Sequence, residues 1–382
     1  MATIATLLSG GECVGVGARE AGLTHLWGFE IENDIAQVAR DNGFNVTTAD
    51  VMQLDPAALE VPDVLHASPV CKRASGANQS AELNEDGTKE APEDTEMGAK
   101  IASFIDVMTP RIVTIENVYA YRKFKAFKII CNALERGGYM WDFDNLNSAD
   151  YGVSQTRRRL ILRAKRGALL PNLPQPERWV GWYSAILDLI PTLPDSQFAK
   201  WQLERLPDEI KQALLVDSAG YPDETGARVA VTRGIIEPAN TIVANHERRP
   251  MRAFIVGTNA NDTSKAKIYQ TADDPVQVIR TPGDGRELRA FLVGGGNTQL
   301  AQVDSKARNE SEPSFTVFAG DNHRSRAWLS QGRVVSMTPI ALARFQSIPD
   351  SYILPESKKL ACAIIGNAVP PLMYQKIIKQ LI

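Results

Sequence analysis

The first fifty residues alternate short apolar runs with turns and helix-compatible segments, and this alternation constrains the fold more than any other feature. An apolar run at residues 3–8 leads into a glycine turn at 9–15 and then into a helix-compatible segment. The next two strand-like runs end on Glu30 and Asp50. Strands that alternate with helices form parallel sheets, whose strands have their carboxyl ends at one edge. The sequence therefore predicts an α/β fold with the glycine turn, Glu30 and Asp50 at that edge.

This edge suits a nucleotide-like ligand. Glycines let a ligand approach the backbone N–H groups of a helix N-terminus, and an acid that ends a strand can accept hydrogen bonds from ribose hydroxyls. The turn does not match the pattern G-x-G-x-x-G, so a purely structural turn with solvated acids is an equal alternative.

A cysteine follows the next apolar run. Residues 64–65 form a short buried strand, Pro69 breaks it, and Cys71 is followed by two cations, Lys72 and Arg73. Nearby cations stabilise the thiolate, the nucleophilic form of cysteine, and lower its pKa from about 8.5. Cys71 is therefore the candidate nucleophile, and the alternative is a small buried residue, as most free cysteines are.

A later strand, predicted over residues 111–115, ends on Glu116. If this strand is parallel to the one before Cys71, the carboxyl group faces the same cleft, whereas an isolated acid there is usually a helix cap or a surface charge. Between the two strands, the acidic stretch 77–98 is predicted to be a mobile loop, and residues 99–108 are predicted to be a helix.

Three consecutive arginines, Arg157, Arg158 and Arg159, enter the next apolar strand. The alternation of a strand sends the first and the third to one face and the second to the other. We expect one face to point into the cleft. Contact with phosphate or with a base is the functional interpretation, and a salt-bridged structural cluster is the equal alternative.

The composition alone excludes few classes of protein. The chain has 382 residues, 44% of them hydrophobic, and 42 Lys and Arg against 45 Asp and Glu give a net charge of -3. Its length allows two domains, and the near balance of charge neither demands nor excludes nucleic acid. The four cysteines have no paired spacing, so we expect a reducing compartment and no structural zinc. With no apolar stretch of membrane-spanning length and no charged start of a signal peptide, the sequence predicts a soluble, cytoplasmic protein.

Several short motifs occur in a fixed order along the chain, and together they resemble the C5-cytosine DNA methyltransferase family. The motifs are Ser68-Pro69-Val70-Cys71, Glu116-Asn117-Val118, Gln155-x-Arg157-x-Arg159, the stretch 333–350, and Ile365-Gly366-Asn367-Ala368-Val369-Pro370. The resemblance covers about residues 3–165 and 333–382. It implies a Rossmann-like methyltransferase domain that is completed by the C-terminal segment.

The resemblance also implies roles for individual residues. Cys71 would add to C6 of cytosine, and Glu116 would hold N3 and the exocyclic amine. Arg159 would contact the O2 side of the base, and Arg157 would support the cysteine loop. Because a duplex hides the ring atoms, the cytosine would have to be flipped out.

The cofactor implied by the resemblance is S-adenosylmethionine, which would leave as S-adenosylhomocysteine. The residues expected to line its site are Leu8, Gly10, Glu30, Asp50 and Asn367. Two positions depart from the family pattern. Val70 stands where the family usually has proline before the cysteine, and Glu12 lies in a turn that usually continues with glycine.

Residues 168–331 have no place in the catalytic sheet, so we expect two domains: a catalytic one formed by 1–167 and 332–382, and a smaller, mostly β, target-recognition domain formed by 168–331. Acid-Pro pairs at Pro238, Pro275 and Pro313 recur at a nearly constant interval, each before a strand-like run and a later Arg-Ala-aromatic triplet. This indicates a repeated unit of strand plus basic loop, with chance similarity as the alternative. The residues expected to contact DNA are Gln155, Arg248, Arg249, His323 and Arg324, with His246 beside them.

The predicted function is transfer of a methyl group to C5 of a cytosine in a specific sequence of double-stranded DNA. An RNA cytosine methyltransferase and a non-catalytic DNA-binding relative remain as alternatives. The expected setting is a bacterial or phage-encoded monomer, with a cognate restriction endonuclease as a possible partner.

Overall fold

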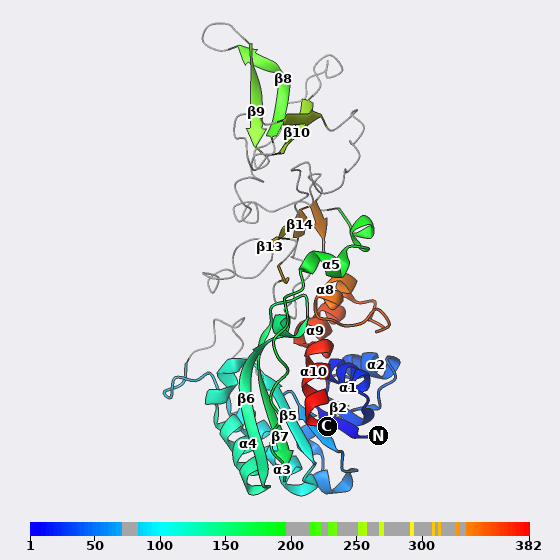
Figure 1. Ribbon diagram of the computed structural model, residues 1–382, viewed down its shortest axis with the longest axis vertical. Helices are drawn as coiled ribbons and strands as arrows, with labels where there is room; N and C mark the ends of the chain where they lie inside the picture. Colours follow the sequence, from blue (N-terminus) through cyan, green and yellow to red (C-terminus); the bar gives the residue numbers. More distant parts are fainter. Residues whose placement is uncertain are drawn as a thin grey trace.

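The computed structural model describes residues 1–70, 83–195, 312–314 and 335–382 in full. Between residues 214 and 334 it also describes the backbone of several strands. A seven-stranded sheet forms the larger part of the molecule (Figure 1). In spatial order its strands are β3 (Val46–Thr48), β2 (Thr24–Glu30), β1 (Thr3–Leu7), β4 (Val64–Ala67), β5 (Ile112–Asn117), β7 (Arg158–Arg166) and β6 (Tyr139–Asn147).

The first five of these strands are parallel, whereas β7 is antiparallel to both β5 and β6. Parallel strands are covered on both faces and therefore appear as continuous apolar runs rather than alternating ones. All four residues of β4 and all six of β5 are buried. The short apolar runs that the sequence offers at these places are thus the natural strands of such a sheet.

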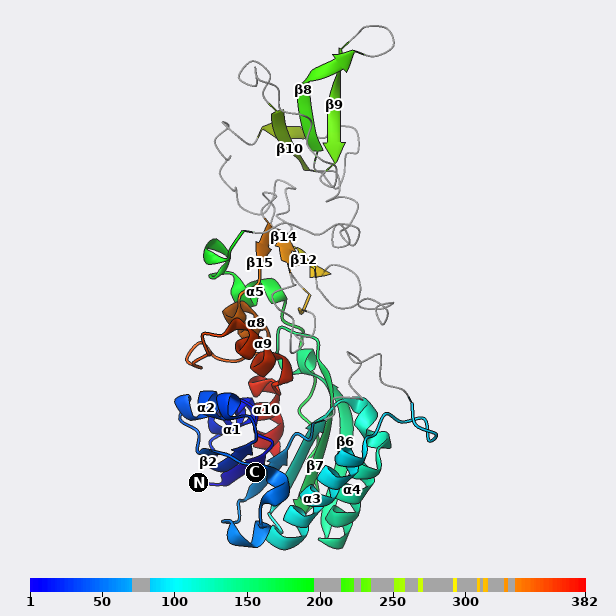
Figure 2. The same cartoon turned by 180° about the vertical axis from the view of Figure 1, so that it is seen from behind.

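Helices cover both faces of the sheet (Figure 1, Figure 2). One face packs against α3 (Pro92–Met108) and α4 (Lys125–Arg136), and the other packs against α1 (Cys13–Glu20) and α10 (Pro371–Leu381). The alternation along β1 illustrates this division, because Leu7 belongs to the first core and Ile4 to the second. A third core joins α2 (Asn33–Asp41) to α5 (Trp182–Ile186), α8 (Pro339–Phe345) and α9 (Lys358–Asn367).

The acidic segment after the cysteine differs from the prediction. Helix α3 begins at Pro92 instead of residue 99, because proline suits the first helical turn and the Asp94 carboxylate caps it by accepting the backbone N–H of Ala91 (2.8 Å). Just before it, Glu90 is buried and accepts the backbone N–H groups of Lys125 (2.7 Å) and Ala126 (2.9 Å) at the start of α4. The prediction of a loop up to residue 98 is therefore wrong from residue 92 onward. Residues 71–82 lie outside the described part.

The C-terminal segment returns to the N-terminal strands. Helix α10 packs along α1, and the Tyr352 hydroxyl donates to the carbonyl oxygen of Gly11 at 2.5 Å. The Asn42 side chain, at the end of α2, also donates to the carbonyl of Ile353. The last part of the chain thus closes against the glycine turn of the first part.

The strands described between residues 214 and 336 form two antiparallel sheets, and all of them except β15 lie in the predicted recognition domain. One has the order β11 (Lys267–Gln270), β10 (Met251–Gly257), β8 (Leu214–Pro222) and β9 (Arg228–Gly234). The other has the order β13 (Arg308–Asn309), β12 (Phe291–Val293), β14 (Arg326–Trp328) and β15 (Val334–Ser336). The division of the chain at residues 168 and 331 remains a prediction.

The predicted repeat remains a prediction. The triplets 252–254 and 326–328 lie within β10 and β14, which belong to different sheets, and the expected basic loops around residues 246–249 and 323–324 lie outside the described residues. The acid-Pro pairs at 237–238 and 274–275 lie outside the described residues. No helix that the structure describes is long and apolar enough to cross a membrane.

Candidate active site and cofactor site

A buried ion pair joins the ends of β5 and β7. The Nε atom of Arg159 lies 3.0 Å from Oε1 of Glu116, and the two side chains are only 16% and 7% exposed. The Glu116 carboxylate lies at the carboxyl end of β5. Because β7 is antiparallel to β5, the Arg159 guanidinium near the start of β7 lies at the same edge of the sheet. Because the pair is largely shielded from water, its electrostatic attraction is stronger than that of a surface pair.

The arginine alternation predicted from the sequence is confirmed. Arg157 is 2% exposed, and Arg158 lies on the solvent side. The Nη2 atom of Arg157 donates to the carbonyl of Gly366 at 3.0 Å, at the end of α9. Burial, followed by the nearby Arg159 guanidinium, lowers the pKa of Arg157 well below its usual range. Burial also lowers the pKa of Arg159, and the Glu116 carboxylate opposes that shift.

The ends of β4 and β5 are tied together by an asparagine. The Nδ2 atom of Asn117 donates to the carbonyl of Pro69 at 2.9 Å, and its Oδ1 accepts the backbone N–H of Val118 at 2.7 Å. Pro69 is two residues before Cys71 in the sequence, and Asn117 directly follows Glu116. Cys71 itself lies outside the described residues, as do Lys72 and Arg73.

A buried hydrogen-bonded chain lies beneath this edge. His66 on β4 contacts the Thr114 hydroxyl through Nδ1 (2.8 Å) and the Ser68 hydroxyl through Nε2 (2.9 Å). Thr114 in turn lies 3.0 Å from the hydroxyl of Tyr374 on α10. Burial lowers the pKa of His66 to about 3, so the imidazole is neutral. The sequence does not reveal this chain, because Thr114 and Tyr374 are far from His66 in the sequence and belong to none of the motifs.

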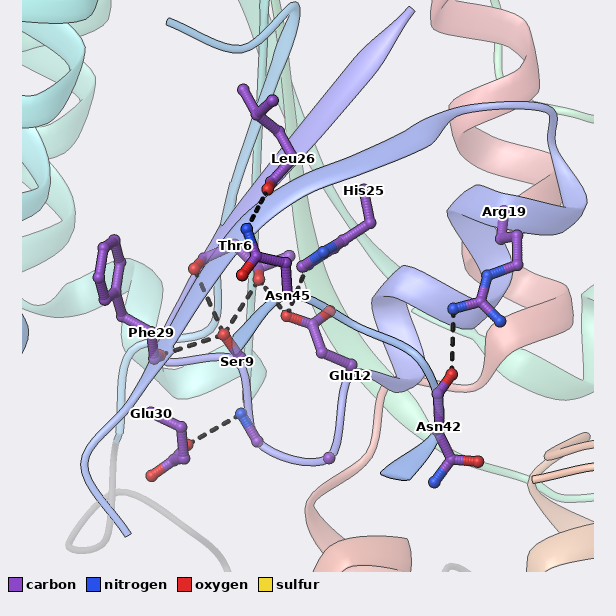
Figure 3. Close-up of polar contacts among 12 residues, drawn as sticks. Thr6, Ser9, Glu12, Arg19, His25, Leu26, Phe29, Glu30, Asn42 and Asn45 are labelled. Atoms are coloured by element: carbon purple, nitrogen blue, oxygen red, sulfur yellow. Dashed lines mark hydrogen bonds and ion pairs between the residues drawn. The ribbon is translucent and has the colours of Figure 1, made fainter. Parts of the chain in front are cut away.

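The glycine turn between β1 and α1 is held by an acid, as Figure 3 shows. The backbone N–H of Gly10 donates to Oε2 of Glu30 at 2.9 Å, and the N–H of Glu32 donates to Oε1 at 3.0 Å. Gly10 has φ of +55°, and a β-carbon added there would meet nothing within 4 Å. There is therefore open space directly over the turn.

The other predicted cofactor residues lie around this turn or at the same edge. Leu8 begins the turn with a left-handed backbone (φ +58°). Asp50 follows β3 and caps a short helical turn by accepting the N–H of Met52 at 2.9 Å. Asn367 ends α9, is exposed, and follows Gly366, which binds Arg157.

Of the residues predicted to contact DNA, only Gln155 lies in the part of the chain that the structure describes. Gln155 is fully buried, and its backbone bridges Ser314, so its side chain does not face solvent. Arg248, Arg249, His323 and Arg324 lie outside the described residues, as does His246. Their contact with DNA remains a prediction.

A family model described as C-5 cytosine-specific DNA methylase matches residues 2–382. The chain belongs to this family. Membership confirms the resemblance of the sequence motifs and the class of enzyme that it implied. The Rossmann-like fold class is confirmed as well, because the α/β sheet agrees with solved methyltransferase structures.

The relatives of this DNA methylase differ in how much of their length they share with it. The type II methyltransferase M.AgeI of Thalassovita gelatinovora is 23% identical over 96% of both chains. The mouse (Mus musculus) DNA (cytosine-5)-methyltransferase 1 is 30% identical over 42% of this chain, which spans only 11% of the mouse protein. Among solved structures, the Entamoeba histolytica methyltransferase EhMeth has a TM-score of 0.56 at 11% identity, over 100% of this chain and 98% of its own.

The residues predicted to line the cofactor site have hydrogen-bonding groups that fit S-adenosylmethionine, the cofactor that the family implies. Each oxygen of Glu30 accepts one backbone N–H and retains capacity for a second hydrogen bond, which a ribose hydroxyl can supply. The open space over Gly10 allows close approach to the backbone. The Asn367 side chain is exposed at the end of α9 and supplies an amide donor and acceptor.

Proposed function

We propose that this protein transfers a methyl group from S-adenosylmethionine to C5 of cytosine in double-stranded DNA through a covalent adduct with Cys71. The observation that carries the proposal is the hydrogen bond from Asn117 to Pro69. It ties the segment that leads to Cys71 to the residue beside Glu116. The segment that leads to the candidate nucleophile is therefore joined to the strand that carries the candidate acid, at the ends of two neighbouring parallel strands.

The chemistry needs these two groups together, because C5 of cytosine is a poor nucleophile. Addition of the Cys71 thiolate to C6 forms an S–C6 bond, and the electron pair of the C5–C6 double bond then becomes available at C5. Glu116 supplies a hydrogen bond or a proton at N3, which stabilises the charge displaced into the ring. When bound, S-adenosylmethionine supplies the electrophilic methyl group that C5 takes up. Loss of the C5 proton to water and cleavage of the S–C6 bond restore the ring and the thiolate.

Two arginines would position the groups that take part in the reaction. Arg159 holds the Glu116 carboxyl group in place and presents its remaining N–H donors toward the O2 side of the base. Arg157, bonded to Gly366, links the catalytic edge to the C-terminal segment that carries Asn367. Leu8, Gly10, Glu30, Asp50 and Asn367 would hold the cofactor.

Residues 168–331 would select the DNA sequence, since base recognition needs side chains presented into the major groove and arginine is the commonest reader of guanine. The double variant Arg248→Ala/Arg249→Ala should weaken discrimination between target and non-target duplexes by about 1 to 3 kcal/mol for each base contact. An equal loss of affinity for all sequences would indicate phosphate contacts instead.

The decisive experiment is methylation of a plasmid by the purified protein, followed by bisulfite sequencing. The expected result is protection of cytosines in one short sequence, and only when S-adenosylmethionine is added. Complete conversion of all cytosines, or methylation of RNA but not of DNA, would contradict the proposal.

A further inference from the structure

Glu12 occupies an unusual place in the cofactor turn. It precedes α1 with φ of +59° and ψ of +34°, a left-handed conformation that favours glycine. Glycine is also the residue that the family resemblance leads one to expect in this turn. Glu12 makes no capping hydrogen bond to α1, and its side chain is instead fully buried beneath the turn (Figure 3).

The buried carboxylate is an acceptor for two side chains. Its Oε1 accepts the Thr6 hydroxyl in a short hydrogen bond and lies 3.0 Å from Nε2 of His25. A carboxylate can only accept, so the Thr6 hydroxyl and the His25 Nε2–H both donate to it. The second oxygen, Oε2, has no hydrogen-bond partner.

The surrounding backbone leaves room for this carboxylate. A β-carbon on Gly15 would lie 2.6 Å from Oε2 of Glu12, and one on Gly28 would lie 2.5 Å from Oε1. Both distances are too short for any real contact. The glycines on α1 and β2 therefore leave the space in which the Glu12 carboxylate lies, beside the Thr6 and Ser9 hydroxyls at Gly28 and the Phe44 ring at Gly15.

The same contacts continue to the part of the turn that faces the ligand. The Thr6 hydroxyl, which donates to Glu12, also lies 3.0 Å from the Ser9 hydroxyl, and the Ser9 hydroxyl donates to the carbonyl of Phe29 at 3.1 Å. The backbone N–H of Ser9 also donates to the carbonyl of Phe29 at 2.9 Å. Gly10, the next residue, donates to Glu30. These contacts, together with the peptide bond between Ser9 and Gly10, connect Glu12 to the residues beside the open space over Gly10.

We propose that Glu12 is a positioning residue for the cofactor: its Oε1, by accepting from Thr6 and His25, fixes the turn in the conformation that binds S-adenosylmethionine. This inference rests on the proposed function, since it assumes that cofactor. In this proposal, the conformation of the turn depends on the oxygen atom that accepts these two hydrogen bonds and not on the negative charge of Glu12. The substitution Glu12→Gln keeps this acceptor, because the amide oxygen takes the place of Oε1 and the NH₂ group takes the place of the unpartnered Oε2.

The test compares three variants by calorimetric titration with S-adenosylmethionine. Glu12→Gln should keep the dissociation constant within about threefold of the parent, whereas Glu12→Gly should raise it by about tenfold or more, the loss of roughly one buried hydrogen bond. Glycine adopts the left-handed backbone without strain, so the loss must come from the side chain. Glu20→Gln, an exposed acid at the end of α1, is the matched control and should bind normally.

A purely structural role would predict a different pattern. For a positioning residue, the single-turnover rate at saturating cofactor should change little in Glu12→Gly while the dissociation constant rises. If Glu12→Gly fails to fold, Thr6→Val provides the second variant, because it removes the donor that connects Glu12 to Ser9 and should also weaken binding.

Equal affinity of folded Glu12→Gly and the parent would overturn the inference. So would a Glu12→Gln variant that binds as weakly as Glu12→Gly, because charge and not the acceptor would then carry the effect. If the parent itself does not bind S-adenosylmethionine, the proposed function fails and this inference fails with it, which the titration of the parent reveals separately.

Discussion

The cofactor turn and the candidate catalytic pair lie at the same edge of one sheet, but they hold their carboxylates in different ways. Glu30, at the end of β2 beside the turn, accepts two backbone N–H groups, whereas Glu116 pairs with the guanidinium of Arg159. Uncharged donors fix the position of a carboxylate and leave its neighbourhood without a compensating cation. A guanidinium adds charge, and charge affects a reaction in which protons and electrons move.

From this difference we expect the turn to position a ligand and the pair to take part in the chemistry. A substitution in one region should then leave the function of the other region intact. Variants on the catalytic side should slow the reaction and leave cofactor binding intact, and variants on the cofactor side should do the reverse.

The largest expected effect belongs to the candidate nucleophile. The parent protein should form a denaturation-resistant adduct with DNA that contains 5-fluorocytosine when S-adenosylmethionine is present, because fluorine cannot leave C5 as a proton does. Cys71→Ala should form none. Cys131→Ala is the control: Cys131 is buried and burial raises its pKa to about 12, so it stays a thiol. An adduct of equal intensity in Cys71→Ala, seen on a denaturing gel, would exclude this residue.

The next effect concerns the acid in the buried pair. Glu116→Gln should slow the single-turnover rate by at least about 10²-fold, since an amide cannot supply the proton that general acid catalysis needs. The dissociation constant for the cofactor should stay the same. Glu135→Gln, an exposed acid on α4, should react normally. Equal rates for Glu116→Gln and the parent would assign the acid to another residue.

On the cofactor side, Glu30→Gln should give the opposite pattern. A glutamine can accept only one of the two N–H groups, so the hydrogen bond to Gly10 or to Glu32 is lost. The dissociation constant for S-adenosylmethionine should rise by about 10- to 100-fold, the range for hydrogen bonds to a charged group. The single-turnover rate at saturating cofactor should change little, and the exposed neighbour variant Glu32→Gln should bind normally. A slow chemical step in Glu30→Gln would break the comparison between the two regions.

The sequence predicted the catalytic edge better than the cofactor turn, and the reason is physical. The expected positions of Glu116 and Arg159 at the cleft follow from rules of strand direction and alternation that apply to any sheet, although their ion pair was not predicted. The contact between Glu12 and His25 follows no such rule, because it depends on how a turn folds over the neighbouring strand. Asn117 was recognised only as part of a motif, and its bond to Pro69 joins residues 48 positions apart.

The acidic segment shows how a local pattern can mislead. A count of charges predicts a mobile loop there, but Glu90 is buried and satisfies two backbone N–H groups of α4. Such groups at a helix start need an acceptor, and a distant acid can supply it as well as a local one. Only the three-dimensional structure identifies which of several acids does so.

The smallest expected effect tests His66, which joins β4 to α10 beneath both regions. The folded protein holds it neutral with a pKa of about 3, whereas an unfolded chain has a value of about 6.5. Between these two pKa values the unfolded state binds a proton that the folded state does not. The contribution of His66 to the free energy of unfolding is therefore fully present above pH 6.5 and is lost as the pH falls toward the folded-state value. The slope from this residue is about 1.4 kcal/mol per pH unit. Glutamine can contact Thr114 and Ser68 without titrating, so urea unfolding of His66→Gln between about pH 7 and pH 5 should lack that slope. Identical pH dependence in the two proteins would mean that His66 is already charged, or exposed, in the folded state.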